Sequence, residues 1–156
     1  MTADGKPAFP KAVIWVSARE WTSLKGHPRD APIDRVISPQ VRTFEPGAAL
    51  IPGVEAIALY GHTVGHVAYR ITAEGRTIED IGDLAHSSVV SLAHPEWSAG
   101  IDEDQKAGAA MRQAELARLD GAHTLIFAPH FPFPGVGHLA KEGVGYRWVP
   151  EPGFQP

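Results

Sequence analysis

The sequence contains no cysteine, and this absence restricts the chemistry open to the chain. Disulfide bonds and thiolate metal sites are excluded, so any bound metal ion has to be held by histidine, aspartate, glutamate or backbone oxygen. No run approaches the roughly 18–20 apolar residues that a membrane span needs. Met1–Pro10 has no long apolar segment of the kind found in signal peptides. We therefore expect a soluble protein without a membrane partner, and the cytoplasm is the favoured location.

Runs of basic residues are missing as well. The 14 Lys and Arg residues are scattered, and with 18 Asp and Glu they give a net charge of −4 and a pI near 6.0. This balance offers no basic surface for nucleic acid, which we exclude as a partner. The 156 residues, 44% hydrophobic and 21% charged, are typical of one folded domain with a buried core.

Short apolar runs separated by glycine and proline predict a mixed α/β protein. The runs expected to be strands are residues 12–17, 41–45, 54–60, 67–72, 76–81 and 124–128. The fourth and fifth of these form a predicted hairpin in which Gly75 supplies a positive φ. A helical turn or two is expected at 18–24. Residues 25–40 are expected to be a surface loop with at most a short element at 35–38, and residues 84–100 a long loop.

One long helix is predicted over residues 101–120. Asp102 is the expected N-cap, the acidic Glu103 and Asp104 suit the first turn, and Gly121 suits the position just beyond the helix. The face at helical spacing that we expect to pack in the core comprises Ala107, Ala110, Met111, Ala114 and Ala117 or Arg118.

Three of the predicted strands end at a turn that carries a possible metal ligand. His62 lies in the segment GHTVGH, Asp83 in IGD, and His130 in PHFPFPG. Glycine and proline stiffen or shape these turns, which lowers the entropy lost when a side chain binds an ion. Strand ends commonly converge at one edge of a sheet, and two imidazoles with one carboxylate are a workable set for one divalent ion.

Other residues near these turns have expected supporting roles. His66 is expected to stabilise the GHTVGH turn, with metal ligation as the alternative. His138 is expected to orient the proline-rich loop or to line a pocket, and His86 to lie at the surface or at a pocket rim. Phe131 and Phe133 form either an apolar wall for a substrate or part of the core.

The three segments, in this order over residues 61–138, resemble the metallo-β-lactamase superfamily of metal-dependent hydrolases. GHTVGH resembles the family's GHTxGH turn, Gly82-Asp83 its bridging-aspartate motif, and residues 129–138 the last histidine motif of a subgroup with lactonases and phosphotriester hydrolases. The resemblance implies an αββα sandwich of the α/β (α+β) class, with a mixed sheet and flanking helices. It implies that His62 binds one metal ion, His130 a second, and that the catalytic Asp83 bridges them. Zinc is the expected metal, with other divalent ions as alternatives.

The family's first motif, HxHxDH, is absent from this sequence. We therefore expect residues 1–156 to form a single partial domain, about the C-terminal half of the sandwich. Its own donors suffice for one zinc ion, and two require the missing ligands from elsewhere. The first hypothesis is a hydrolase of small ester, lactone or phosphoester substrates that obtains those ligands from another segment. The alternative is a non-catalytic half-domain that forms a homo-oligomer or complements an N-terminal partner, because a half sandwich exposes one face.

Overall fold

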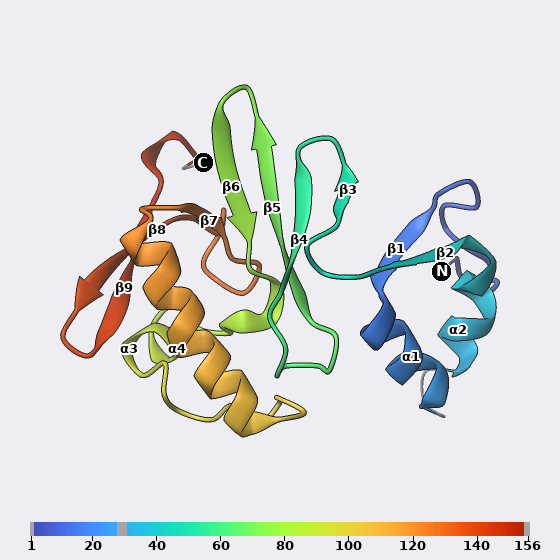
Figure 1. The fold of residues 1–156 in the computed structure, drawn as a ribbon, viewed down its shortest axis with the longest axis horizontal. Coiled ribbons are helices and arrows are strands. Elements are labelled where there is room, and N and C mark those ends of the chain that lie inside the picture. Colours follow the sequence, from blue (N-terminus) through green and yellow to red (C-terminus); the bar gives the residue numbers. More distant parts are fainter. Residues whose placement is uncertain (1, 28–30, 155–156) are drawn as a thin grey trace.

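The structure, a computed structural model, describes residues 2–27 and 31–154. Its strands form a parallel pair, β1 and β2, and a larger sheet in the order β3-β4-β5-β6-β7-β8-β9 (Figure 1). The strands are β1 Ile14–Ser17, β2 Val41–Phe44, β3 Ala49–Ile51, β4 Val54–Ala58, β5 Val67–Ala73, β6 Arg76–Asp80, β7 Leu125–Phe127, β8 Val136–Glu142 and β9 Gly145–Pro150. The α-helices are α1 Ala18–Gly26, α2 Ala31–Ile37, α3 Val90–Ala93 and α4 Gln105–Gly121, and the 3-10 turns are η1 Ser38–Gln40, η2 Gly82–Leu84 and η3 Pro152–Phe154.

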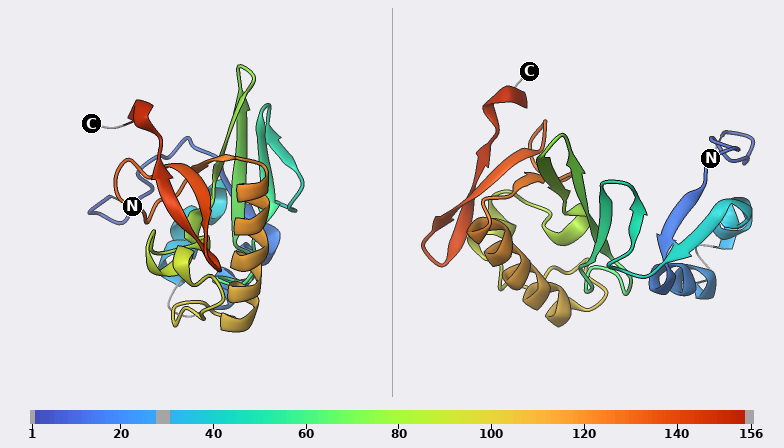
Figure 2. Two further views of the ribbon diagram at one scale, coloured as in Figure 1. Left: turned by 90° about the vertical axis from the view of Figure 1, so that its left-hand side faces the viewer. Right: turned by 45° about the horizontal axis from the view of Figure 1, so that its top comes forward.

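The elements β1, α1, α2, η1 and β2 form an N-terminal unit beside the large sheet (Figures 1 and 2). Ser17 ends β1 and caps α1, because its Oγ accepts a hydrogen bond from the Glu20 backbone N–H at 3.2 Å. The same hydroxyl donates to the Gly65 carbonyl at 2.6 Å, which ties the unit to the main body. The loop predicted for residues 25–40 is wrong in part, since α2 and η1 occupy most of it; residues 28–30 lie outside the described residues.

The large sheet is antiparallel except for the parallel pair β6 and β7. The chain leaves β6, passes through α3 and α4, and returns in β7, as a parallel connection requires. The predicted hairpin is confirmed as β5 and β6, and Gly75 in its turn has φ +75°. The strands β3, β8 and β9 were not predicted, because β3 has only three residues and Gly or Pro residues occur within the other two. The long loop predicted after β6 contains η2 and α3.

The helices α3 and α4 lie beside the large sheet (Figure 2), and the core cluster contains residues from the helices and from the sheet. Leu116 and Leu119 of α4 are fully buried in this cluster with Ile126 of β7 and Ile81, which follows β6. The helix face predicted to pack is wrong except for Met111, which is partly buried against the core; the buried residues of α4 are Gly108, Ala109, Arg112, Glu115, Leu116 and Leu119. Two charged residues, Arg112 and Glu115, lie on the buried face, where they pair with other charged residues. A search for apolar residues at helical spacing therefore does not find this face.

The predicted start and end of the long helix are also wrong. Asp104 is the N-cap, accepting from the Ala107 backbone N–H at 2.9 Å, and Asp102 lies buried before the helix. Gly121 is the last helical residue, and His123, with φ +49°, takes the left-handed conformation that follows. Within the described part of the chain, none of the helices combines the length and apolar character needed to cross a lipid bilayer.

Among the residues that the structure describes, a groove lies on the sheet face turned away from α4, near the β5–β6 hairpin. Because Glu79 and Ile126 face α4, their neighbours Ile78 and Leu125 point to the other side. These two residues and Ile71 line a groove of about 260 Å³. Ile71 is 39% exposed. An apolar sheet face therefore lies open to solvent in the isolated chain.

Candidate metal centre

The turn that follows β4 is held by close backbone packing. Gly61 has φ +139°, and a Cβ on it would lie 2.4 Å from the backbone nitrogen of Gly108 in α4. Only glycine fits such an approach, so the turn that presents His62 rests directly on the helix. The backbone N–H of Leu59 also donates to the His66 carbonyl at 2.9 Å, which closes the turn.

The N-terminal unit supports the same turn through Glu20. Its Oε2 accepts the Thr63 hydroxyl at 2.6 Å and the Gly65 backbone N–H at 3.0 Å. A Cβ on Gly65 would lie 2.2 Å from the Glu20 backbone nitrogen, so α1 and the turn touch backbone to backbone. The GHTVGH segment is therefore fixed from both sides before any ligand binds.

The three predicted donors meet at the carboxylate of Asp83. His62 Nε2 lies 3.2 Å from Asp83 Oδ2, and His130 Nε2 lies 2.5 Å from Asp83 Oδ1. Asp83 sits in η2, directly after β6, and both His130 and Asp83 are 42% exposed. The turns after β4, β6 and β7 thus deliver their polar residues to one sheet edge, as the sequence predicted.

A buried ion pair holds the other side of the His62 ring. His62 Nδ1 lies 3.0 Å from Asp102 Oδ1, and Asp102 Oδ2 accepts from Arg112 Nη2 at 3.0 Å. The Asp102 side chain is 1% exposed and that of Arg112 3% exposed. Arg112 also donates to the Leu84 carbonyl at 2.8 Å, so one guanidinium links this pair to the segment that carries Asp83. Hydrogen bonding at Nδ1 leaves Nε2 as the nitrogen available to an ion.

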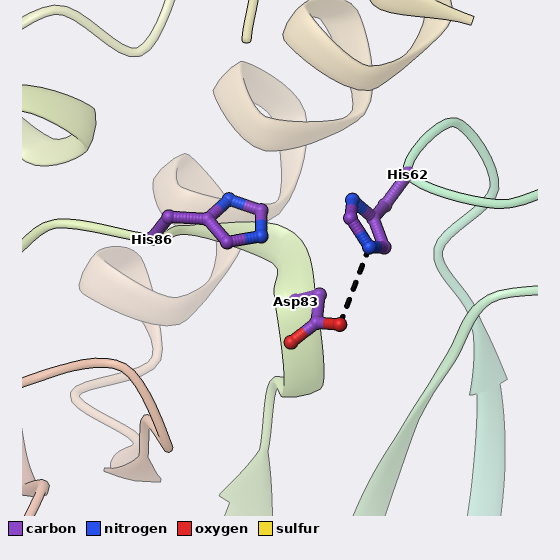
Figure 3. Close-up of side chains that lie close together, drawn as sticks. All are labelled: His62, Asp83 and His86. Carbon is purple, nitrogen blue, oxygen red and sulfur yellow. Dashed lines mark ion pairs between the residues drawn. The ribbon is translucent and has the colours of Figure 1, made fainter. Parts of the chain in front are cut away.

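The structure adds a histidine that the sequence reasoning placed at the surface or a pocket rim. The His86 ring centroid lies 5.0 Å from that of His62 and 4.8 Å from that of His130. His62, Asp83 and His86 each offer one ligand atom, and these atoms all lie within 4.8 Å of one another (Figure 3). The available signal was the nearness of His86 to Asp83 in the sequence, since the two residues are only three positions apart.

The other predicted histidines have partners within the protein. His66 Nδ1 lies 2.9 Å from the Leu59 carbonyl, and its Nε2 accepts the Asp83 backbone N–H at 3.0 Å. Both nitrogens are therefore engaged in holding the turn and the Asp83 segment together. His138, on β8, contacts the Thr124 carbonyl at 3.1 Å and Glu151 Oε2 at 3.2 Å, neither of which belongs to the proline-rich loop.

The aromatic residues of the proline-rich loop have different environments. Phe131 is buried in the core and meets the Trp148 ring edge-on at 4.9 Å, whereas Phe133 is 82% exposed. A cleft of about 330 Å³ opens beside the cluster, between the N-terminal unit and the sheet. The residues that line it include Trp15, Ser17, Glu20, His62, His66, Tyr69 and Asp83.

The combined effect of burial and neighbouring groups lowers the pKa values of three residues at this site, which favours neutral imidazoles and an ionised carboxylate. Burial is the main cause of a lowered pKa for His86, and nearby His62 and His130 lower it further. Burial also lowers the pKa of His66, against the opposing effect of its hydrogen bond to the Leu59 carbonyl. For Asp83, burial acts to raise the pKa, but the hydrogen bond from His130 and the neighbouring imidazoles hold it below its usual value.

The donor set fits a divalent metal ion. Neutral imidazoles and a carboxylate are the ligands that zinc takes in cysteine-free sites. No Lys or Arg side chain is paired with Asp83, so its oxygens are shared only with imidazole nitrogens among the described contacts. The buried Nδ1 of His86 has no hydrogen-bond partner within the described part of the chain, which leaves this ring uncommitted.

Comparison with solved structures places this fold among known hydrolases. AidC, a dizinc quorum-quenching lactonase with a bound product, superposes with a TM-score of 0.87 at 26% identity over 96% of this chain. The hydrolase AbOPH of the β-lactamase superfamily gives 0.83 at 31% identity over 95%. A probable metal-dependent hydrolase from Staphylococcus aureus gives 0.76 at 17% identity over 96%, a likeness of fold alone. No family model and no curated protein sequence matches this chain.

These neighbours confirm the resemblance and the fold class predicted from the sequence. The chain has the mixed α/β architecture of metallo-β-lactamase superfamily hydrolases. It spans 58% of the length of AidC and of AbOPH, and 56% of the length of the Staphylococcus aureus protein.

Proposed function

We propose that this chain is the metal-binding part of a hydrolase that acts on a small ester, lactone or phosphoester substrate. The observation that supports it most is the meeting of His62 and His130 on the two oxygens of Asp83, at 3.2 and 2.5 Å. In this proposal His62, Asp83 and His130 hold zinc or another divalent ion, and Asp83 is the residue shared between two ions when both are present.

A divalent metal in such a centre lowers the pKa of bound water and stabilises negative charge on the reacting centre. The chain's own residues hold the proposed metal ligands in place. Asp102 fixes the His62 ring, and Glu20 fixes the turn that carries it, so neither has to be ordered when an ion binds. The adjoining cleft, with Trp15 and Tyr69 on its wall, is the proposed place for the apolar part of a substrate.

The sequence has no HxHxDH motif, and its own donors fall short of a full two-ion set. We propose that the further ligands come from a second segment or polypeptide. AidC is named as a dizinc lactonase with N-hexanoyl-homoserine product, and that chemistry makes an N-acyl homoserine lactone a suitable first probe.

The test measures zinc uptake and hydrolysis by the purified chain, alone and co-expressed with the part of AbOPH that this chain does not match. Substrates are N-hexanoyl-homoserine lactone, a p-nitrophenyl ester and a phosphotriester. We expect zinc binding by the chain and turnover in the co-expressed form. His62→Ala and Asp83→Ala should abolish both, whereas His94→Ala, outside the cluster, should not. A folded chain without zinc uptake or turnover in either form would contradict the proposal.

The open sheet face favours a second candidate, a half-domain that acts by association. Ile71, Ile78 and Leu125 line the exposed groove, and Ile51 of the edge strand β3 is 57% exposed. Such a face is stabilised by a covering partner, either a second copy of this chain or an N-terminal segment. Zinc uptake without turnover in both forms, together with a dimer mass in light scattering, would support this candidate over the hydrolase.

A further inference from the structure

We propose that His86 is a metal ligand of this chain, completing a four-donor set with His62, Asp83 and His130. The inference rests on the proposed metal centre and extends it, because the family resemblance assigns ligand roles to the other three residues and none to His86. The chain lacks the HxHxDH motif and therefore the imidazoles of that motif. His86 would supply one further imidazole from within the chain.

The backbone around His86 is fixed so that its ring faces the cluster. Leu84 and Ala85, which precede it, are buried in the core at 4% and 0% exposure. The Ser91 hydroxyl accepts the backbone N–H of His86 at 3.2 Å and that of Ser87 at the same distance. The backbone that carries the His86 ring therefore loses little conformational entropy when the ring binds an ion.

The positions of the donor atoms suit a common ion. The ligand atoms of His62, Asp83 and His86 all lie within 4.8 Å of one another, so one point lies within about 2.8 Å of all three, and small side-chain movements bring that distance to the roughly 2.0–2.2 Å of zinc–ligand bonds. The His86 ring is tilted by 48° to His62 and by 36° to His130, so the rings are not stacked face to face. Figure 3 shows the edge of the His86 ring directed toward the space between His62 and Asp83.

Hydrogen bonding separates His86 from the neighbouring structural histidine. Both nitrogens of His66 are engaged, by the Leu59 carbonyl and the Asp83 backbone N–H. The buried Nδ1 of His86 has no partner among the described residues. A neutral imidazole carries one donor and one acceptor nitrogen, and ligation through Nε2 would settle the proton on Nδ1.

The absence of cysteine makes a direct spectroscopic test possible. The purified chain, the variants His86→Ala and His86→Cys, and the matched controls His94→Ala and His94→Cys are titrated with Co²⁺ alone. His94 lies in the same segment and stacks on Trp97 at 3.9 Å, outside the cluster. A thiolate that binds Co²⁺ adds a sulfur-to-metal charge-transfer absorption in the near ultraviolet, whereas an unbound thiol does not.

We expect His86→Cys, and not His94→Cys, to show this absorption with bound Co²⁺. His86→Ala should weaken Co²⁺ binding by about tenfold or more and change the visible Co²⁺ spectrum, while His94→Ala leaves both unchanged. Unchanged affinity and spectrum in His86→Ala, with no thiolate band in His86→Cys, would overturn the role of His86 while the proposed centre stands. If the unsubstituted chain binds no Co²⁺ or Zn²⁺, the centre itself is overturned. Circular dichroism of each metal-free variant establishes that it is folded.

Discussion

Two clusters of ionisable residues lie along β6, and they are built in opposite ways. At the helix-facing side of the strand, Glu79 is fully buried and contacts Arg118 of α4 and Arg70 of β5. At the end of the strand, Asp83 is half-exposed and contacts only imidazole nitrogens of His62 and His130 among the described ion pairs.

The difference lies in which partners occupy the carboxylate oxygens. Arg118 bonds to Glu115 as well as Glu79, so the buried cluster is closed by guanidinium groups that cannot bind metal. Imidazoles around Asp83 are partners that a metal ion can recruit after they lose a proton. Similar residue types thus make a structural ion-pair network on β6 and a candidate metal centre in the turn directly after that strand.

The largest effect on stability is expected from the buried ion pair of Asp102 and Arg112, which contacts the His62 ring. Asp102→Ala leaves the Arg112 guanidinium buried without its carboxylate, and we expect a loss of about 3–5 kcal/mol in the free energy of unfolding. Urea unfolding of the metal-free chain measures it. The matched control, Asp104→Ala at the exposed N-cap, should cost only about 1 kcal/mol. Equal losses in the two variants would show that Asp102 has no special structural role.

The next largest effect is the stabilisation by zinc, which should depend on Asp83 and not on Glu79. An ion that binds only the folded chain raises the free energy of unfolding by about 2.7 kcal/mol at a free concentration 100 times its Kd. We expect this gain in the unsubstituted chain and in Glu79→Gln, and its loss in Asp83→Ala. Urea unfolding with and without zinc is the measurement. A gain that persists in Asp83→Ala would place the ion elsewhere.

The smallest expected effect is a pH dependence that belongs to the buried cluster. Burial raises the pKa of Glu79 to about 7, with the hydrogen bond to Glu115 acting in the same direction. The folded chain then binds more protons than the unfolded chain between pH 4.5 and about 7, so stability falls as pH rises through this window. We expect a fall on the order of 1–2 kcal/mol across this window.

Glu79→Gln is the reference for this measurement, because its amide cannot ionise. The difference in unfolding free energy between the unsubstituted chain and Glu79→Gln should decrease toward pH 7 and then level off. A difference that stays flat from pH 4.5 to 8 would contradict the raised pKa.

The sequence predicted the position of the three turns where the signal was local. Gly61, Gly82 and Pro129 mark the turns in which His62, Asp83 and His130 lie, and the strands before these turns were predicted from short apolar runs. The prediction failed where burial depends on distant partners. Arg112 and Glu115 lie on the buried face of α4 because Asp102 and Arg118 neutralise them, which no apolar periodicity reports.

The sequence by itself determined the three donor turns, their order and the hairpin between the first two, because glycine, proline and β-branched residues act on the chain near them. Only the tertiary structure brought the His86 ring beside His62 and Asp83 and placed Asp102 against His62 instead of at the N-cap of α4. Both depend on distances between segments far apart in the chain, which are set when the large sheet and α4 pack around their common core.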